Sequence, residues 1–211
     1  MGMKNKFGLA VAVYLLFCGL SYFSEEGDAL FALVTLIGIG YPLAYAKWTG
    51  DWASLGFRKA NLSSSVRWGI LGGILSGLIG VAVLPSLSVP SNLGLQLLIG
   101  VPLWAFIASP FQEFFFRSYL QPIVQERFGD LSGMLLANLG FTLWHYCAPF
   151  SGSPVPLNTV LGFASTFLAG LAYAYIFQRT KNIISPWLAH LLTGVIFIIV
   201  GAMDFVSVLG K

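Results

Sequence analysis

Runs of 18 or more mainly apolar residues recur along the whole sequence, and they limit the possible fold more than any other feature. A run of this length can cross the hydrocarbon core of a bilayer as an α-helix. Hydrophobic residues occupy 57% of the 211 positions and charged residues only 9%, whereas a soluble domain has about 25% charged residues. We therefore expect an all-α polytopic membrane helix bundle that forms a single integral membrane domain, residues 1–211.

The apolar runs predict about seven transmembrane helices, or eight if an interfacial or broken helix is counted separately. The N-terminal run follows two lysines, as in a signal peptide, but no small-residue cleavage site follows it, so we interpret it as a spanning helix. Pro42, Pro102 and Pro110 are expected to bend helices, and Pro122–Phe128 is polar enough to lie at the membrane surface as a short helix or turn. The predicted spans are 7–23, 29–46, 66–83, 93 to about 121, 131–147, 158–177 and 183–203.

Small residues within the apolar runs predict how the helices pack. Gly69, Gly73 and Gly77 recur at four-residue spacing, which lets a neighbouring helix approach the backbone closely. Cys18 and Cys147 both lie in apolar stretches. They are expected to be small buried residues rather than a disulfide or a metal cluster.

The basic residues predict the orientation of the chain. Nine of the eleven Lys and Arg residues lie at turns on the N-terminal side of the predicted bundle, and the first turn on the other side carries Glu25, Glu26 and Asp28. Because cytoplasmic loops are enriched in Lys and Arg, we expect a plasma-membrane protein with its N-terminus cytoplasmic and its C-terminus outside. The net charge is +3, and the basic residues do not cluster on one face. We therefore expect the lipid bilayer as a partner and no binding of nucleic acid. The nine residues are Lys4, Lys6, Lys47, Arg58, Lys59, Arg67, Arg127, Arg179 and Lys181.

One acid, one arginine and both histidines lie deep within the predicted spans. Glu113 and Arg117 are four residues apart and share one helical face, and a charge at this depth costs about 2.5–3.5 kcal/mol on insertion, so it usually has a function. His145 and His190 each lie in an apolar helix, where a packed ring bonded to a backbone carbonyl is the common alternative to a functional role. Rise per residue places Glu113, His145 and His190 roughly 21, 21 and 12 Å from the inner surface. A shared polar site is therefore expected.

Three short segments resemble the motifs of one family of membrane proteins. They are Q-E-F-F-F-R, residues 112–117, F-T-L-W-H, residues 141–145, and P-W-L-A-H, residues 186–190. These segments resemble the E-E-x-x-x-R, F-x-x-x-H and H-x-x-x-N motifs of the CAAX-protease and bacteriocin-processing (CPBP, or Abi) endopeptidases. The resemblance covers residues 93–195, which we interpret as a CPBP-like catalytic core, and residues 1–92 then form N-terminal transmembrane helices.

The resemblance implies a glutamate-dependent intramembrane endopeptidase that acts without a metal or other cofactor. In such an enzyme a carboxylate and a histidine activate water, while a second histidine and an Asn hold the oxyanion. The implied substrate is a membrane-anchored protein or peptide, cleaved in or near its anchored segment. The predicted catalytic residues are Glu113, His145 and His190, and the supporting residues are Gln112, Arg117 and Asn138.

Two positions depart from the family pattern. Gln112 stands where the family has its first Glu, and Gly194 stands where it has the Asn. Gln cannot act as a general base, so either Glu113 takes this role, or the chain is a non-hydrolytic relative, or the sequence carries an inactivating substitution. Thr193, three residues after His190, and Asn138, two helical turns before His145 on the same face, are the candidate substitutes for the missing Asn. Asn138 is preferred, with helix packing as its alternative role.

Three alternatives stand beside a metal-free peptidase. Glu113, His145 and His190 could provide three zinc ligands, although the sequence has no H-E-x-x-H motif. A catalytically inactive membrane scaffold or immunity-type binding protein would use the same polar residues only to hold helices together. A transporter is disfavoured because no repeated half with matching broken helices is present.

Overall fold

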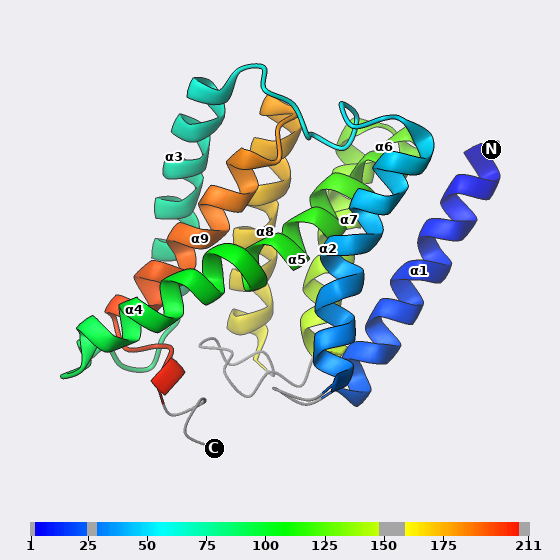
Figure 1. Ribbon diagram of the computed structural model, residues 1–211. Coiled ribbons are helices and arrows are strands. Elements are labelled where there is room, and N and C mark those ends of the chain that lie inside the picture. The colour runs from blue at the N-terminus through cyan, green and yellow to red at the C-terminus, as the bar shows by residue number, and fades with distance from the viewer. Residues whose placement is uncertain (1–2, 25–28, 148–158, 207–211) are drawn as a thin grey trace.

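The computed structural model describes residues 3–24, 29–147 and 159–206, and all regular structure in these ranges is helical. The segments join into seven continuous helices (Figure 1). They are α1 Met3–Phe23, α2 Ala29–Thr49, α3 Leu62–Val81, one long helix Leu93–Phe128, α7 Asp130–Cys147, α8 Val160–Thr180 and α9 Ile184–Ile199. Predicted and observed ends differ by four residues or fewer, except that the long helix continues to Phe128, seven residues beyond its predicted end. The predicted start at Asn158 lies outside the described residues.

The helices differ in how well their length and composition suit a membrane span. α1, α2, α3, the long helix and α8 are long and apolar enough to cross a membrane, and α9 is apolar but shorter. α7 carries Asp130, Asn138 and His145 among its apolar residues. The prediction of a multi-pass helical protein is confirmed, although within the described residues five helices rather than seven meet the criteria for a full span.

The long helix changes its winding twice, on either side of Glu113. In chain order it consists of α4 Leu93–Leu103, the π-helical turn η1 Trp104–Ala108, α5 Ser109–Glu113, the π-helical stretch η2 Phe114–Leu120 and α6 Gln121–Phe128. Each π-helical stretch ends two residues before a proline, Pro110 or Pro122. A proline ring clashes with the carbonyl four residues earlier, and a widened turn relieves that clash.

This helix is too long to cross a membrane upright. Its 36 residues extend about 54 Å at 1.5 Å per residue, whereas a hydrocarbon core is about 30 Å thick. Figure 1 shows it running diagonally across the bundle. In the sequence, Glu113 is near the middle of this helix. Pro122–Phe128, predicted as a separate surface segment, belongs to α6, which continues η2 without a break and ends at Gly129 with φ 84°.

Glycines of α3 allow α9 to approach closely, as the sequence predicted. A Cβ on Gly73 would lie 2.6 Å from Cβ of Leu192 and 2.8 Å from the carbonyl oxygen of Ala189. Cβ atoms on Gly69 and Gly77 would also meet side chains of α9. α9, which carries His190, is therefore held by backbone-close packing against α3.

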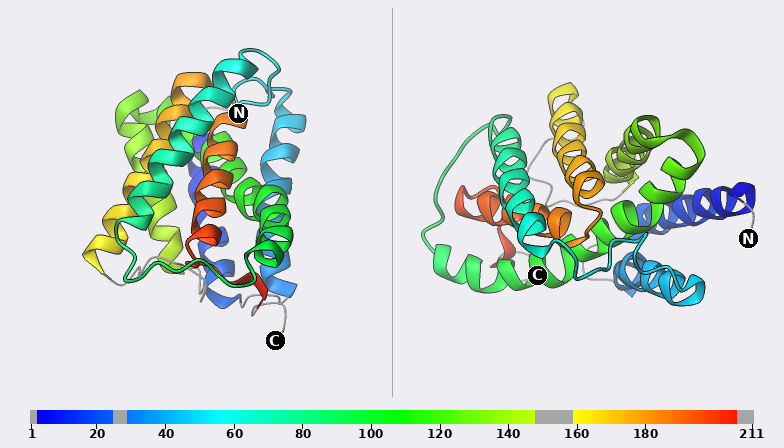
Figure 2. Two further views of the ribbon diagram at one scale, coloured as in Figure 1. Left: turned by 90° about the vertical axis from the view of Figure 1, so that its left-hand side faces the viewer. Right: turned by 90° about the horizontal axis from the view of Figure 1, so that it is seen from above.

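Aromatic packing holds α1 against the long helix and α7. Phe17 stacks on Phe115 at 4.2 Å between ring centres and on Trp144 at 5.5 Å. The indole N–H of Trp144 donates to Oγ of Ser21 at 2.8 Å. The view from above in Figure 2 separates α1 and α2, at one end of the molecule, from α3 and α9 at the other. The long helix connects the two groups.

Several predicted basic turns meet at one end of the bundle. Lys6 of α1 lies 3.4 Å from the carboxylate of Glu126 in α6. Nδ2 of Asn182, between α8 and α9, donates to the carbonyls of Arg58 and Ala60 before α3, at 3.1 and 3.0 Å. The predicted acidic turn lies outside the described residues. Both cysteines are free, with Cys18 buried and Cys147 half-buried.

Candidate active site

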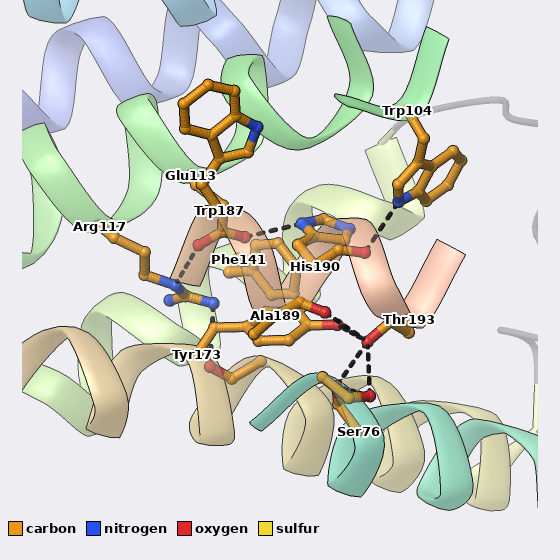
Figure 3. A network of polar contacts seen from close by, with 12 residues as sticks. Ser76, Trp104, Glu113, Arg117, Phe141, Tyr173, Trp187, Ala189, His190 and Thr193 are labelled. Atoms are coloured by element: carbon orange, nitrogen blue, oxygen red, sulfur yellow. Dashed lines mark hydrogen bonds and ion pairs between the residues drawn. The ribbon is translucent and has the colours of Figure 1, made fainter. Parts of the chain in front are cut away.

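Glu113 is the last residue of α5, where the helix widens into η2. Its side chain is fully buried, and its two carboxylate oxygens face different partners (Figure 3). Oε1 lies 2.8 Å from Nδ1 of His190, and Oε2 lies 3.3 Å from Nε of Arg117. A carboxylate taken out of water needs such partners, because an isolated buried charge costs several kcal/mol. Its charge is shared between an arginine on the same helix and a histidine on α9.

Arg117 is also fully buried and connects three helices. Its Nη2 donates to the carbonyl of Gly170 on α8 at 3.0 Å and to Oδ1 of Asn138 on α7 at 3.3 Å. The guanidinium carbon lies 4.5 Å from the centre of the Phe141 ring, a cation–π contact. Arg117 therefore fixes the carboxylate of Glu113 relative to α7 and α8.

His190 is enclosed by aromatic rings and only 6% exposed. Its ring stacks on Tyr173, with 4.9 Å between centres and 20° between planes. The rings of Trp104 and Phe141 meet it edge-on at 5.8 and 6.4 Å. An ionised carboxylate only accepts hydrogen bonds, so Nδ1 carries the proton in the contact with Glu113. The other ring nitrogen, Nε2, lies on the side of the ring away from that contact.

His145 lies near the end of α7 and is half-buried. Its Nδ1 lies 2.8 Å from the carbonyl oxygen of Phe141, so Nδ1 is the donor and Nε2 faces elsewhere. The ring of Phe141 lies beside both histidines, 4.6 Å from His145 and 6.4 Å from His190 between ring centres. The structure thus places His190 in direct contact with Glu113 and His145 against the Phe141 ring that also meets His190. The carbonyl bond of His145 also matches the packing alternative that the sequence left open.

Gln112 and Glu113 have different surroundings although they are adjacent. Neighbouring residues of a helix point about 100° apart, and Glu113 is the one that contacts His190. Gln112 is 6% exposed, and within the described part of the chain its Oε1 has no hydrogen-bond partner. The position at which the family has its first Glu is therefore not the position that binds the histidine of α9.

Asn138 joins η2, α7 and α8. Its Oδ1 accepts from Arg117, and its Nδ2 donates to the carbonyl of Phe167 at 2.9 Å. Its side chain is fully buried. These two bonds support the packing role that the sequence left open beside the role of oxyanion donor.

A chain of hydroxyl groups beneath His190 extends the site to α3. The hydroxyl of Tyr173 donates to Oγ1 of Thr193 at 2.7 Å. That Oγ1 lies 2.5 Å from Oγ of Ser76 and 3.0 Å from the carbonyl oxygen of Ala189, as Figure 3 shows. The sequence analysis did not single out Tyr173 or Ser76, because one hydroxyl in an apolar helix is an ordinary packing feature. Thr193, the other substitute for the missing Asn, belongs to this chain of bonds.

Trp104 is a third residue of the site whose role the sequence did not indicate. Its Nε1 donates to the carbonyl oxygen of His190 at 2.9 Å. It also fills the space beside Gly194, where the family has the Asn, because a Cβ at this position would overlap the indole ring. No sequence spacing could have indicated this contact, since Trp104 and Gly194 lie on different helices.

The geometry gives the zinc hypothesis no support. Among the described residues, no three His, Cys, Asp or Glu side chains are arranged so that they could hold a metal ion. Both oxygens of Glu113 face nitrogen atoms, of Arg117 and of His190. A zinc ion bound by Glu113 would compete with both of these contacts.

The comparison with known families agrees with the motifs. The family described as type II CAAX prenyl endopeptidase Rce1-like matches residues 94–196, from α4 to α9. No curated protein and no solved structure was found to match the chain. The matched segment contains Glu113, His145 and His190. Residues 94–196 are a domain of the type II CAAX prenyl endopeptidase Rce1-like family, within the CPBP membrane endopeptidases.

Proposed function

We propose that this protein is a membrane-embedded peptidase that hydrolyses a peptide bond in or near a membrane-anchored segment of a protein. The family match supports a peptidase. The observation that carries the proposal is the 2.8 Å contact between the carboxylate of Glu113 and Nδ1 of His190. A carboxylate beside an imidazole inside a helix bundle is suited to proton transfer.

The base in this proposal is Nε2 of His190. Glu113 accepts the Nδ1–H bond, holds the tautomer whose Nε2 has a free lone pair, and stabilises the imidazolium that forms when Nε2 takes a proton from water. The hydroxide attacks the scissile carbonyl. As the C–N bond breaks, the proton passes from Nε2 to the leaving amine. Glu113 thus acts through His190, and no carboxylate is needed at position 112.

For the oxyanion of the tetrahedral intermediate we propose His145. Nδ1 of this ring is anchored on the carbonyl of Phe141, so Nε2 donates to the oxyanion only when the ring takes up a second proton. A donor placed where negative charge develops in the transition state typically contributes about 10²–10³ in rate. His145 is half-buried, whereas Glu113 is fully buried.

The family description suggests the first substrate to test. It names CAAX prenyl endopeptidases, and a CAAX segment is a C-terminal Cys, two aliphatic residues and one further residue, prenylated on the Cys. We propose that the protein cleaves such C-terminal segments. A farnesylated peptide and the same peptide without the lipid separate a requirement for the prenyl group from recognition of the peptide alone.

The test uses the full chain in lipid nanodiscs. Cleavage of both peptides is followed by mass spectrometry for the wild type, Glu113→Gln and His190→Gln. The variants are expected to lose at least about 100-fold in rate, because they remove the base or the group that orients it. Glu126→Gln is the matched control, because Glu126 lies at the surface beside Lys6. Wild-type rates in folded Glu113→Gln and His190→Gln proteins would refute the proposal.

A catalytically inactive scaffold or immunity-type binding protein is the second candidate. Gln112 and Gly194 favour it, because both family positions lack their usual side chains. Its signature is a wild-type protein that cleaves neither peptide, together with a Glu113→Ala variant that is defective in cells. Cleavage by the wild type that depends on Glu113 excludes this alternative.

A further inference from the structure

Trp104 and Gly194 are complementary in shape. A Cβ built on Gly194 would overlap three atoms of one indole ring, of which Nε1 is the nearest and Cδ1 and Cε2 are next. Because these atoms belong to one rigid ring, a side chain at position 194 can fit only if Trp104 moves. The indole ring thus occupies the space that the Cβ of any side chain at position 194 would need.

The indole N–H is directed at the catalytic helix rather than at a cavity. It donates to the carbonyl oxygen of His190 at 2.9 Å, and a carbonyl has a second lone pair for such a bond beside its helical one. The indole ring also meets the His190 ring edge-on, at 5.8 Å between centres. Trp104 begins η1, and π-helical turns are frequent at functional sites.

We propose that Trp104 is a positioning residue for His190 and that Gly194 provides the space for it. This inference rests on the proposed function, in which Nε2 of His190 takes the proton. Three of the contacts of His190 fix the orientation of its imidazole. Glu113 binds Nδ1, Tyr173 covers one face of the ring, and Trp104 binds the main chain and packs against the ring. At position 194, where the family pattern has an asparagine, this chain has a glycine. The indole of Trp104 fills the space beside it and donates its N–H to the main chain of His190.

The pairing is tested by a double-mutant cycle read by thermal unfolding in detergent. Gly194→Ala is expected to lower Tm by about 3 °C or more, because the methyl group overpacks against the indole. In a Trp104→Ala background the same change should alter Tm by less than about 1 °C, because the space is then empty. Gly94→Ala is the control for helix propensity, since a Cβ at Gly94 would meet nothing within 4 Å. If Gly194→Ala lowered Tm equally in the wild-type and Trp104→Ala backgrounds, the proposed fit between Trp104 and Gly194 would be refuted.

The positioning role is tested with Trp104→Phe, which keeps an aromatic ring but removes the N–H group. The chain has only two histidines, so ¹⁵N-histidine NMR gives four ring-nitrogen signals, which His145→Gln assigns. In the wild type we expect Nδ1 of His190 protonated and Nε2 unprotonated. In Trp104→Phe we expect a mixture of tautomers, with kcat about tenfold lower and KM within twofold.

The two readouts separate this inference from the proposed function. A Trp104→Phe protein with the wild-type tautomer and wild-type kcat shows that Trp104 only fills space, which overturns the inference. If Trp104→Phe changes the tautomer of His190 but the wild-type protein cleaves no peptide, the positioning role of Trp104 is supported and the proposed peptidase activity is refuted. The NMR signal requires no substrate and therefore decides the positioning role in either case.

Discussion

Gln112 and Glu113 are adjacent in the sequence, but their side chains have different partners. Both oxygens of Glu113 face charged or ionisable partners, whereas Oε1 of Gln112 has no hydrogen-bond partner in the described part of the chain. The substitution at position 112 removes one family carboxylate but leaves the carboxylate–imidazole pair complete. In the proposed mechanism, activity therefore depends on the Glu113–His190 contact.

Substitutions of Gln112 should have small effects. Gln112→Ala is expected to keep the cleavage rate within about threefold, because the proposed base is His190, whereas Glu113→Gln loses at least about 100-fold. Single-turnover cleavage of the farnesylated peptide measures both. A rate more than about tenfold above wild type in Gln112→Glu would instead locate the stronger base at position 112.

The buried ion pair makes Arg117 a critical residue for stability. Arg117→Met should lower the free energy of unfolding by about 3–5 kcal/mol, because it leaves the carboxylate of Glu113 without its cation. The double variant Glu113→Gln, Arg117→Met should lose less than the sum of the two single variants, because it leaves no unpaired charge. Denaturant titration in detergent gives these energies.

Arg127→Met is the control for this cycle, because Arg127 lies exposed at the end of α6. It should change stability by less than about 0.5 kcal/mol. Additive losses in the Glu113 and Arg117 cycle would show that their 3.3 Å contact carries no coupling.

At the scale of helices, the sequence predicted most positions but not the winding. Apolar runs are a direct signal for helices that cross a bilayer, and the spacing of Gly69, Gly73 and Gly77 predicted the close face of α3. The π-helical stretches η1 and η2 were not predicted, because a reading at 3.6 residues per turn assumes regular winding. The estimated depths placed Glu113 and His190 about 9 Å apart, because they assumed upright helices, whereas the long helix is oblique.

The face between α3 and α9 should tolerate no added methyl group. Gly73→Ala is expected to cost about 1–3 kcal/mol, because the new Cβ would meet the backbone of Ala189 and Cβ of Leu192, neither of which can rotate away. It should also lower kcat, because α9 carries His190. Thermal unfolding and peptide cleavage check the two effects.

Gly40→Ala on α2 is the control for this glycine, because a Cβ there would meet nothing within 4 Å. It should be neutral or slightly stabilising, since alanine is the better helix former. If Gly73→Ala behaved like Gly40→Ala, the helix packing described for α3 and α9 would be wrong.

At the scale of the molecule, the bundle has two chemically different ends. One end joins Lys6 to Glu126 and brings the turn before α3 against the turn between α8 and α9. The opposite end brings the connection after α3 against the end of α9, where the backbone N–H of Ser88 donates to the carbonyl of Val200 at 3.1 Å. The basic residues predict that the first end is cytoplasmic.

Cysteine labelling checks this orientation. In a background with Cys18→Ala and Cys147→Ser, an impermeant maleimide should label Ser88→Cys in intact cells and label Lys59→Cys and Lys181→Cys only after permeabilisation. All three native positions are exposed. Labelling of Lys59→Cys and Lys181→Cys from different sides would contradict the bundle, whereas complete reversal of the pattern would contradict only the orientation.

The shortness of α9 has a consequence for the surrounding lipid. Its 16 residues span about 24 Å, against a hydrocarbon thickness of about 30 Å. A bilayer responds to such hydrophobic mismatch by thinning around the short helix. Thinning beside the helix that carries His190 would bring headgroups and their water nearer to the buried carboxylate–imidazole pair. Acyl-chain length would then be a variable of the proposed reaction, and thicker membranes should lengthen the path of water to Nε2.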